Sequence, residues 1–527
     1  MCAAVVVTNH QEAVGRTGPP LGVCPSLLDP SGQNSRFATV PPQCLTDLHL
    51  DAIIAAMAPD EFQRTVWYTP LADLAVLEYR QDVAEELQRR EFRDLAELLA
   101  GALRRARLSI GAAEQEYYKL PAELNLAEAI SRFTTAVSEA ARRLGELSPR
   151  SAGLRHLAAH LAAYVRDASF AELADANAAI LARVRGHMFE LGIQGGTVWA
   201  GPDTERGPWE DRLRETFGRF SDSRAEEQAA VPPRPRRYLN HIEAQSIGLV
   251  AGLFPESFQQ LHAFVTAHAD FLSADLERLG EELRFYLGFL SVADDLGRTG
   301  VAWCVPRVLA GPDGPLQVSG LVDLALALDA KSGAELVPND LHLGADERIA
   351  FITGPNQGGK TTFARAAGQL AYVASLGLLV PARSASLPLS NTVLTHFPRP
   401  DDPAHDRGGL ADEIHRLHDV MVAADGHSLL VFNELFSATS AEDALQLSAL
   451  LLEQITALGC RVLWVTFLED LVNSVDGAAS LVGQVEPDDP TKPTFRFRAQ
   501  PPSGRSHAVA LAARHGLSSE DLEGRLR

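Results

Sequence analysis

The chain has 527 residues, of which 46% are hydrophobic and 22% charged, and its formal net charge is -21. This length exceeds what one hydrophobic core supports and predicts two or more domains. The acidic surplus excludes a surface that binds phosphate backbones everywhere, so any contact with nucleic acid must be local.

Cysteine usage and apolar runs indicate the compartment. The five cysteines stand singly, without the spacing of a zinc site or a disulfide framework. The N-terminus lacks the basic start and the apolar length of a secretion signal, and no later apolar run is long enough to span a bilayer. We therefore expect a soluble protein of the reducing cytoplasm with no membrane contact.

The first half of the chain is predicted to be mainly helical. Residues 1–45 are rich in turn formers, and we expect a partly ordered lead-in there. From 46 to about 195, apolar residues recur at spacings of three and four, which predicts amphipathic helices. Turn-forming residues predict a connecting loop or linker over 195–240, and periodicity in 254–296 predicts two packed helices or one long arm.

After about residue 315, short apolar strands alternate with helices. The predicted strands are RIAFIT, HSLLVFNE, RVLWVTF and FRFRAQ, with helices from Lys360 and through residue 457. This alternation predicts an α/β sheet with crossover helices. The predicted fold is thus an α/β P-loop domain over 316–527, preceded by a mainly α-helical domain over 46–315 and the lead-in over 1–45.

One motif between the strand RIAFIT and its helix carries the chemistry. Residues 354–361 match GxxxxGK[ST], whose glycines let backbone amides and the helix N-terminus surround phosphates. Lys360 would reach the β- and γ-phosphates, and the Thr361 hydroxyl would bind magnesium, so we expect ATP and Mg²⁺ as cofactors. The predicted nucleotide-binding residues are Gly354, Pro355, Asn356, Gln357, Gly358, Gly359, Lys360, Thr361 and Thr362.

A second strand, HSLLVFNE, ends in Asn433 and Glu434. Asn433 stands where an aspartate usually holds a magnesium-bound water, and it keeps the oxygen without the charge. Magnesium should therefore be held weakly by Thr361 and, through water, by Asn433. Glu434 is the predicted catalytic carboxylate that orients the attacking water, with Lys360 as the second catalytic residue.

The string TGPNQGGKTT resembles the ATPase domain of the MutS family of mismatch-repair proteins, a branch of the ABC-type ATPases. NELFSATSAEDA at 433–444 is similar to the family's run that holds the catalytic carboxylate and a dimer-interface loop. RGGLADEI at 407–414 is similar to its signature segment, although Gly408 replaces a serine, and Phe467 stands where the family usually has histidine. The signature and interface residues that the resemblance implies are Arg407, Gly408, Glu413, Thr439, Ser440 and Asp443.

The helical part resembles the family more weakly. YTPLADLAVLEYRQDVAEEL at 68–87 is similar to the start of its lever domain, and we expect no mismatch-reading domain within residues 1–45. The resemblance implies a homodimer on double-stranded DNA, closed by nucleotide. Three residues of the family pattern are replaced: the aspartate by Asn433, the signature serine by Gly408 and the histidine by Phe467. These replacements predict slow hydrolysis. The alternative is a nucleotide-gated scaffold that hydrolyses ATP negligibly and clamps a protein partner.

Overall fold

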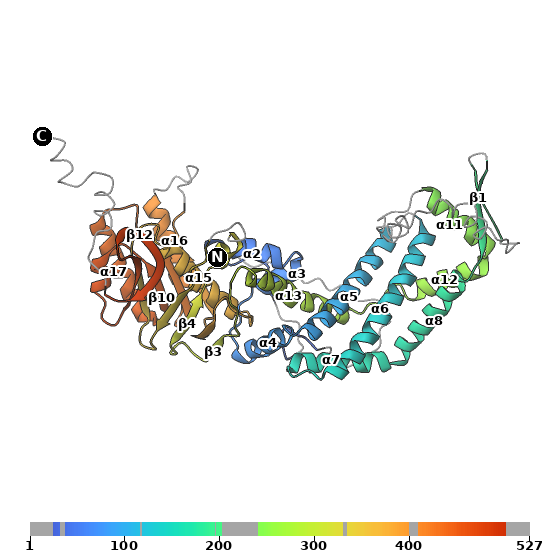
Figure 1. Cartoon of the computed structure of the whole chain (residues 1–527), viewed down its shortest axis with the longest axis horizontal. Coiled ribbons are helices and arrows are strands. Elements are labelled where there is room, and N and C mark those ends of the chain that lie inside the picture. Colours follow the sequence, from blue (N-terminus) through green and yellow to red (C-terminus); the bar gives the residue numbers. More distant parts are fainter. Residues whose placement is uncertain are drawn as a thin grey trace. The chain divides into compact units, whose positions relative to one another are not determined.

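The computed structural model describes residues 25–31, 37–115, 118–194, 197–202, 241–329, 335–399 and 409–501. The described residues form two compact units: one from 98–146 and 158–280, the other from 25–97, 147–157 and 281–501. Most elements before residue 300 are helices, and mixed α/β structure follows (Figure 1). A helical region followed by α/β sheets is therefore confirmed.

Helices form where the apolar spacing predicts them. Asp73 and Asp167 start two of these helices, because each side chain accepts a hydrogen bond from a backbone N–H two residues later. The segment 254–296 forms two helices, α12 and α13. The described helices up to residue 300 are α1 (Cys44–Asp47), α2 (Leu50–Met57), α3 (Glu61–Trp67), α4 (Leu74–Glu86), α5 (Arg90–Gln115), α6 (Lys119–Leu147), α7 (Ala152–Arg166), α8 (Ala168–Arg185), α11 (His241–Leu253), α12 (Pro255–Ala267) and α13 (Ala274–Gly297).

The first unit has an aromatic core and a hairpin. Phe133 makes edge contacts with Phe170 and Phe271, at centroid distances of 6.3 and 5.2 Å. Strands β1 (Phe189–Gln194) and β2 (Thr197–Pro202) pair antiparallel. The expected helix is thus wrong for 189–194 and the expected loop is wrong for 197–202, where β-branched and aromatic residues favour a strand. A two-residue Gly-Gly spacer was the overlooked signal. Residues 203–240 lie outside the described part of the chain.

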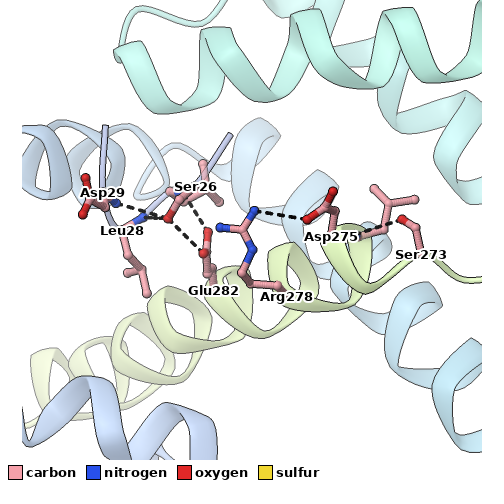
Figure 2. Close-up of polar contacts among 9 residues, drawn as sticks. Ser26, Leu28, Asp29, Ser273, Asp275, Arg278 and Glu282 are labelled. Carbon is pink, nitrogen blue, oxygen red and sulfur yellow. Dashed lines mark hydrogen bonds and ion pairs between the residues drawn. The ribbon is translucent and has the colours of Figure 1, made fainter. Parts of the chain in front are cut away.

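The second unit holds the segment 25–31 through buried polar contacts. The Glu282 carboxylate accepts hydrogen bonds from the Ser26 hydroxyl at 2.9 Å and from the Leu27 N–H at 2.7 Å (Figure 2). Arg80, which is 1% exposed, donates to the Leu28 carbonyl at 2.8 Å. Polar groups that would cost free energy if buried alone therefore satisfy one another here. This part of the predicted lead-in is firmly tied to the unit.

Two sheets complete the second unit. The larger has the order β12-β11-β6-β10-β9-β8, in which all neighbours are parallel except β11 and β12. The smaller has the order β3-β7-β4-β5. All four predicted strands are present. The strands are β3 (Arg307–Leu309), β4 (Leu316–Leu321), β5 (Asn339–Leu343), β6 (Ile349–Thr353), β7 (Ser384–Pro388), β8 (Thr392–His396), β9 (Ser428–Asn433), β10 (Arg461–Val465), β11 (Ala479–Glu486) and β12 (Asp489–Ala499).

Helices cover both faces of the larger sheet (Figure 1). On one face, Phe351, Phe432 and Trp464 pack in one cluster with apolar side chains of α16 and α17. On the other face α15 lies against β6, β8, β9 and β10. Since the strands are parallel, the carboxyl ends of β6, β9 and β10 meet at one edge. The helices of this region are α14 (Leu324–Asp329), α15 (Lys360–Ala374), α16 (Gly409–Ala423), α17 (Ala441–Leu458) and α18 (Glu469–Asn473).

Among the described residues, no helix combines the length and the apolar character that a bilayer crossing requires.

Candidate nucleotide-binding site

The glycine-rich loop joins the end of β6 to the first residue of α15. Gly354 has φ +136°, and a Cβ there would lie 3.0 Å from the backbone N and Cα of Gly483 in β11. Gly359 has φ +86°, and the Gly358 N–H closes a turn on the Pro355 carbonyl at 3.1 Å. Only glycine adopts the positive φ of positions 354 and 359 without strain, and only glycine fits beside Gly483 at position 354. The loop leads directly into a helix N-terminus, where free amides favour anions.

Lys360 is the first residue of α15, directly after this loop, and is 4% exposed. Its ammonium donates to the carbonyls of Gly354 and Pro355 at 3.2 and 3.1 Å. The Phe467 ring covers it at 4.2 Å from the nitrogen to the ring centroid. Burial lowers the pKa of Lys360, and the nearby Glu434 carboxylate partly offsets this. The loop thus holds a positive charge that a phosphate would neutralise.

A hydrogen bond joins the start of α15 to the carboxyl end of β9. The Thr361 hydroxyl donates to the Asn433 amide oxygen at 3.0 Å. The next residue, Glu434, has φ +52° and donates its N–H to the Val465 carbonyl of β10 at 2.9 Å. A non-glycine residue in the left-handed region is uncommon and costs free energy, a feature that often accompanies functional sites. Lys360, Thr361, Asn433 and Glu434, far apart in sequence, therefore lie at one sheet edge.

Glu413 of α16 contacts the loop that follows β9. Its carboxylate accepts the Phe436 N–H at 2.8 Å, and burial raises the pKa of Glu413 despite that hydrogen bond and the nearby Arg416. Phe436 also has a positive φ, of 59°. Glu413 thus holds a strained loop that begins at Glu434. Sequence reasoning placed Glu413 only in the signature segment and missed this contact.

Of the other predicted interface residues, Ser440 and Asp443 are exposed and Thr439 is half-buried. Ser440 is the N-cap of α17, where its hydroxyl accepts the Asp443 N–H at 3.1 Å and donates to the Asp443 carboxylate at 2.7 Å. Thr439 lies 3.5 Å from the same carboxylate. Arg407 and Gly408 lie outside the described residues. The described interface residues are therefore accessible, with a local capping role for Ser440 and Asp443.

A cavity of about 620 Å³ opens beside the loop. Two aromatic side chains of β12, Phe495 and Phe497, line it together with Phe363, whose ring stacks on Phe497 at 4.5 Å. Sequence reasoning missed these rings, although phenylalanines two apart in a strand face one side. The cavity is lined by Leu321, Val322, Asp323, Leu326, Glu335, Leu336, Val337, Asn339, Asn356, Gln357, Gly359, Lys360, Thr361, Thr362, Phe363, Ala366, Glu434, Phe467, Phe495 and Phe497.

Gly354, Pro355, Gly358 and Asn433 do not line the cavity directly. Gly354, Pro355 and Gly358 instead shape the loop, and Asn433 reaches the site through Thr361. Within the described ranges no three His, Cys, Asp or Glu side chains gather as a metal site would require.

The fold and the site define an α/β domain with a glycine-rich loop at the carboxyl edge of a parallel sheet, where ligands of such domains bind. Residues 350–492 match the family model MutS domain V. Over these residues the chain is similar to the MutS family.

Three relatives illustrate the match. The chain is 30% identical over 276 residues to the DNA mismatch repair protein MutS of Shouchella clausii, covering 51% of this chain and 30% of that protein. It is 32% identical over 139 residues to the DNA mismatch repair protein MutS of Thermotoga neapolitana, covering 26% and 17%. It is 30% identical over 155 residues to the MutS protein homolog him-14 of Caenorhabditis elegans, covering 28% and 18%. The aligned part thus spans no more than 30% of the length of these relatives.

Proposed function

We propose that residues 316–527 form a P-loop ATPase domain of the ABC type that binds ATP with Mg²⁺ and hydrolyses it slowly. The observation that carries this proposal is the glycine-rich loop with Lys360 in the lining of a cavity of about 620 Å³. That volume lies within the range of small-molecule sites. Loop amides and the α15 N-terminus favour phosphates, and the rings of Phe495 and Phe497 offer apolar faces to a base.

The donor set fits magnesium. Thr361 and Asn433 present neutral oxygens that lie 3.0 Å apart, and oxygen is the ligand type that this ion prefers. Thr361 would hold the ion directly and Asn433 through a water molecule. When bound, magnesium neutralises phosphate charge. The missing aspartate charge favours weak retention of the ion, in keeping with slow turnover.

Glu434 is the proposed base that orients the attacking water. Its backbone is fixed between β9 and β10, and its side chain lines the cavity beside Lys360. Lys360 would bind the β- and γ-phosphates and stabilise the charge that develops on them. Because Phe467 cannot donate a hydrogen bond to phosphate, one source of such stabilisation is absent.

We further propose that the protein is a cytoplasmic homodimer that couples ATP-dependent closure to binding of double-stranded DNA in mismatch repair. Support comes from the match of residues 350–492 to the MutS domain V model and from similar proteins named DNA mismatch repair protein. The exposed Ser440 and Asp443, next to the half-buried Thr439, leave an accessible surface for a second copy. Residues 46–315 would act as the lever, after the lead-in of residues 1–45. The comparisons do not favour a nucleotide-gated scaffold with a protein partner.

ATP binding and hydrolysis are tested separately. Titration calorimetry with Mg²⁺-ATP should show binding by the wild type and a large loss in Lys360→Ala. In a steady-state ATPase assay, Glu434→Gln should lower the rate by about 10²-fold or more, the usual contribution of a positioned base. Glu453→Gln, an exposed acid of α17, is the matched control. An equal rate in wild type and Glu434→Gln would reject hydrolysis by this site.

DNA binding and dimerisation need their own measurements. Titration with homoduplex, mismatched and branched DNA at several salt concentrations should give salt-dependent binding if phosphates are contacted. Light scattering with and without ATP should detect a dimer. If no DNA binds and the protein stays monomeric in both conditions, the proposed coupling is rejected while ATP binding is left standing.

A further inference from the structure

The Lys360 ammonium is fully engaged by its own protein. Two carbonyl oxygens accept from it at 3.2 and 3.1 Å, and the Phe467 ring covers it at 4.2 Å. A cation over an aromatic face at this distance is attracted by the ring quadrupole. A phosphate that reaches Lys360 must therefore replace at least one of these contacts.

Phe467 is well suited to move away. It follows β10 in the chain and is 50% exposed, so about half of its surface is already in solvent. Burial of Lys360 strengthens the interaction, because the ammonium loses hydration and its pKa is lowered. The ring is thus a half-exposed cover that the charge beneath it helps to hold.

We infer that Phe467 is a specificity-determining residue that covers Lys360 and selects against nucleotides with a terminal γ-phosphate relative to diphosphates. This inference rests on the proposed function. In a P-loop, backbone amides hold the α- and β-phosphates, whereas the lysine reaches the β- and γ-phosphates. Phe467 and Glu434 line the cavity with Lys360 and follow the ends of β10 and β9, where the γ-phosphate would lie. A β-phosphate would replace the carbonyl contacts that Lys360 makes within the loop, whereas a γ-phosphate would take the place of the ring; with a diphosphate the ring therefore stays over the ammonium.

The expected size follows from the interaction. The attraction between a cation and an aromatic face changes a binding affinity by about 2-fold at partly exposed sites and by about 30-fold at desolvated ones. Removing the ring should tighten triphosphate binding by a factor in this range. Diphosphate affinity should change by less than about two-fold, since the ring stays over Lys360 in that complex.

The experiment compares two probes, Mg²⁺-ADP and the Mg²⁺ complex of the β,γ-imido analogue of ATP, by titration calorimetry on the full chain. Phe467→Leu should raise the ratio of triphosphate to diphosphate affinity by about 2- to 30-fold. Phe467→Tyr keeps an aromatic face and should keep the wild-type ratio. The matched control is Phe495→Leu, which removes another exposed ring of the same cavity and should change both affinities alike.

The outcomes separate this inference from the proposed function. If both nucleotides bind to the wild type and Phe467→Leu leaves their ratio unchanged, the cover does not exist, although the ATP site stands. If Phe467→Tyr shifts the ratio as much as Phe467→Leu does, the aromatic face is not the cause and the inference is overturned. If neither nucleotide binds to the wild type, the proposed function itself fails.

Discussion

Replacing Gly354 by alanine tests whether the loop conformation is required. Gly354 has φ +136°, and an added Cβ would lie 3.0 Å from the N and Cα of Gly483. That neighbour cannot yield easily, since it is backbone in β11, with Phe497 and the Thr353 carbonyl within 3.4 Å of its own Cβ position. Disfavoured backbone and overpacking each cost about 1–3 kcal/mol, so Gly354→Ala should destabilise the fold by about 2–6 kcal/mol.

Urea unfolding followed by circular dichroism measures this cost. With a slope of about 2 kcal/mol/M, the midpoint should fall by about 1–3 M, unless the loop shifts to relieve the strain. In that case calorimetry with Mg²⁺-ATP should show weakened binding instead. The control is Gly145→Ala in α6, where a Cβ meets no atom within 4 Å and helix propensity favours alanine. An unchanged midpoint together with unchanged ATP affinity in Gly354→Ala would refute the reasoning.

Three further predictions concern the surroundings of the loop. Glu413→Ala leaves the buried Phe436 N–H unpaired and should cost about 1–3 kcal/mol in urea unfolding, whereas Glu413→Gln retains an acceptor and most of the stability. Thr361→Val should reduce the Mg²⁺ dependence of ATP affinity, measured with and without a chelator; an equal chelator effect in wild type and variant contradicts this. Burial and the Arg416 charge lower the pKa of His396 from 6.5 to about 4, so only the unfolded chain takes up this proton between those values. Stability is full above pH 6.5 and falls towards pH 4 by at most about 3 kcal/mol, a slope that His396→Leu should flatten.

The sequence predicted the α/β region well and its neighbours less well. The four predicted strands and the helix from Lys360 are present because buried parallel strands are continuous apolar runs with clear ends. The hairpin of β1 and β2 was missed, because an isolated pair of short strands gives a weak period-two signal. For 254–296 periodicity left one or two helices open, and only the structure showed two.

Contacts between distant segments could not be read from the sequence. Glu413 and Phe436 are 23 positions apart, and Asn433 and Thr361 are 72 apart. Periodicity reports only which face of an element is apolar, not which element it meets.

The sequence alone determined the phosphate-binding loop and the residues at its strand ends, since loop, strand and helix are contiguous and their conformations depend on local glycines and apolar runs. The tertiary structure decided what surrounds Lys360. Phe467 lies over its ammonium only because β10 pairs with β6 and brings the two chain segments to one edge. Strand pairing between distant segments is a property of the whole fold, so the environment of that charge depends on long-range packing.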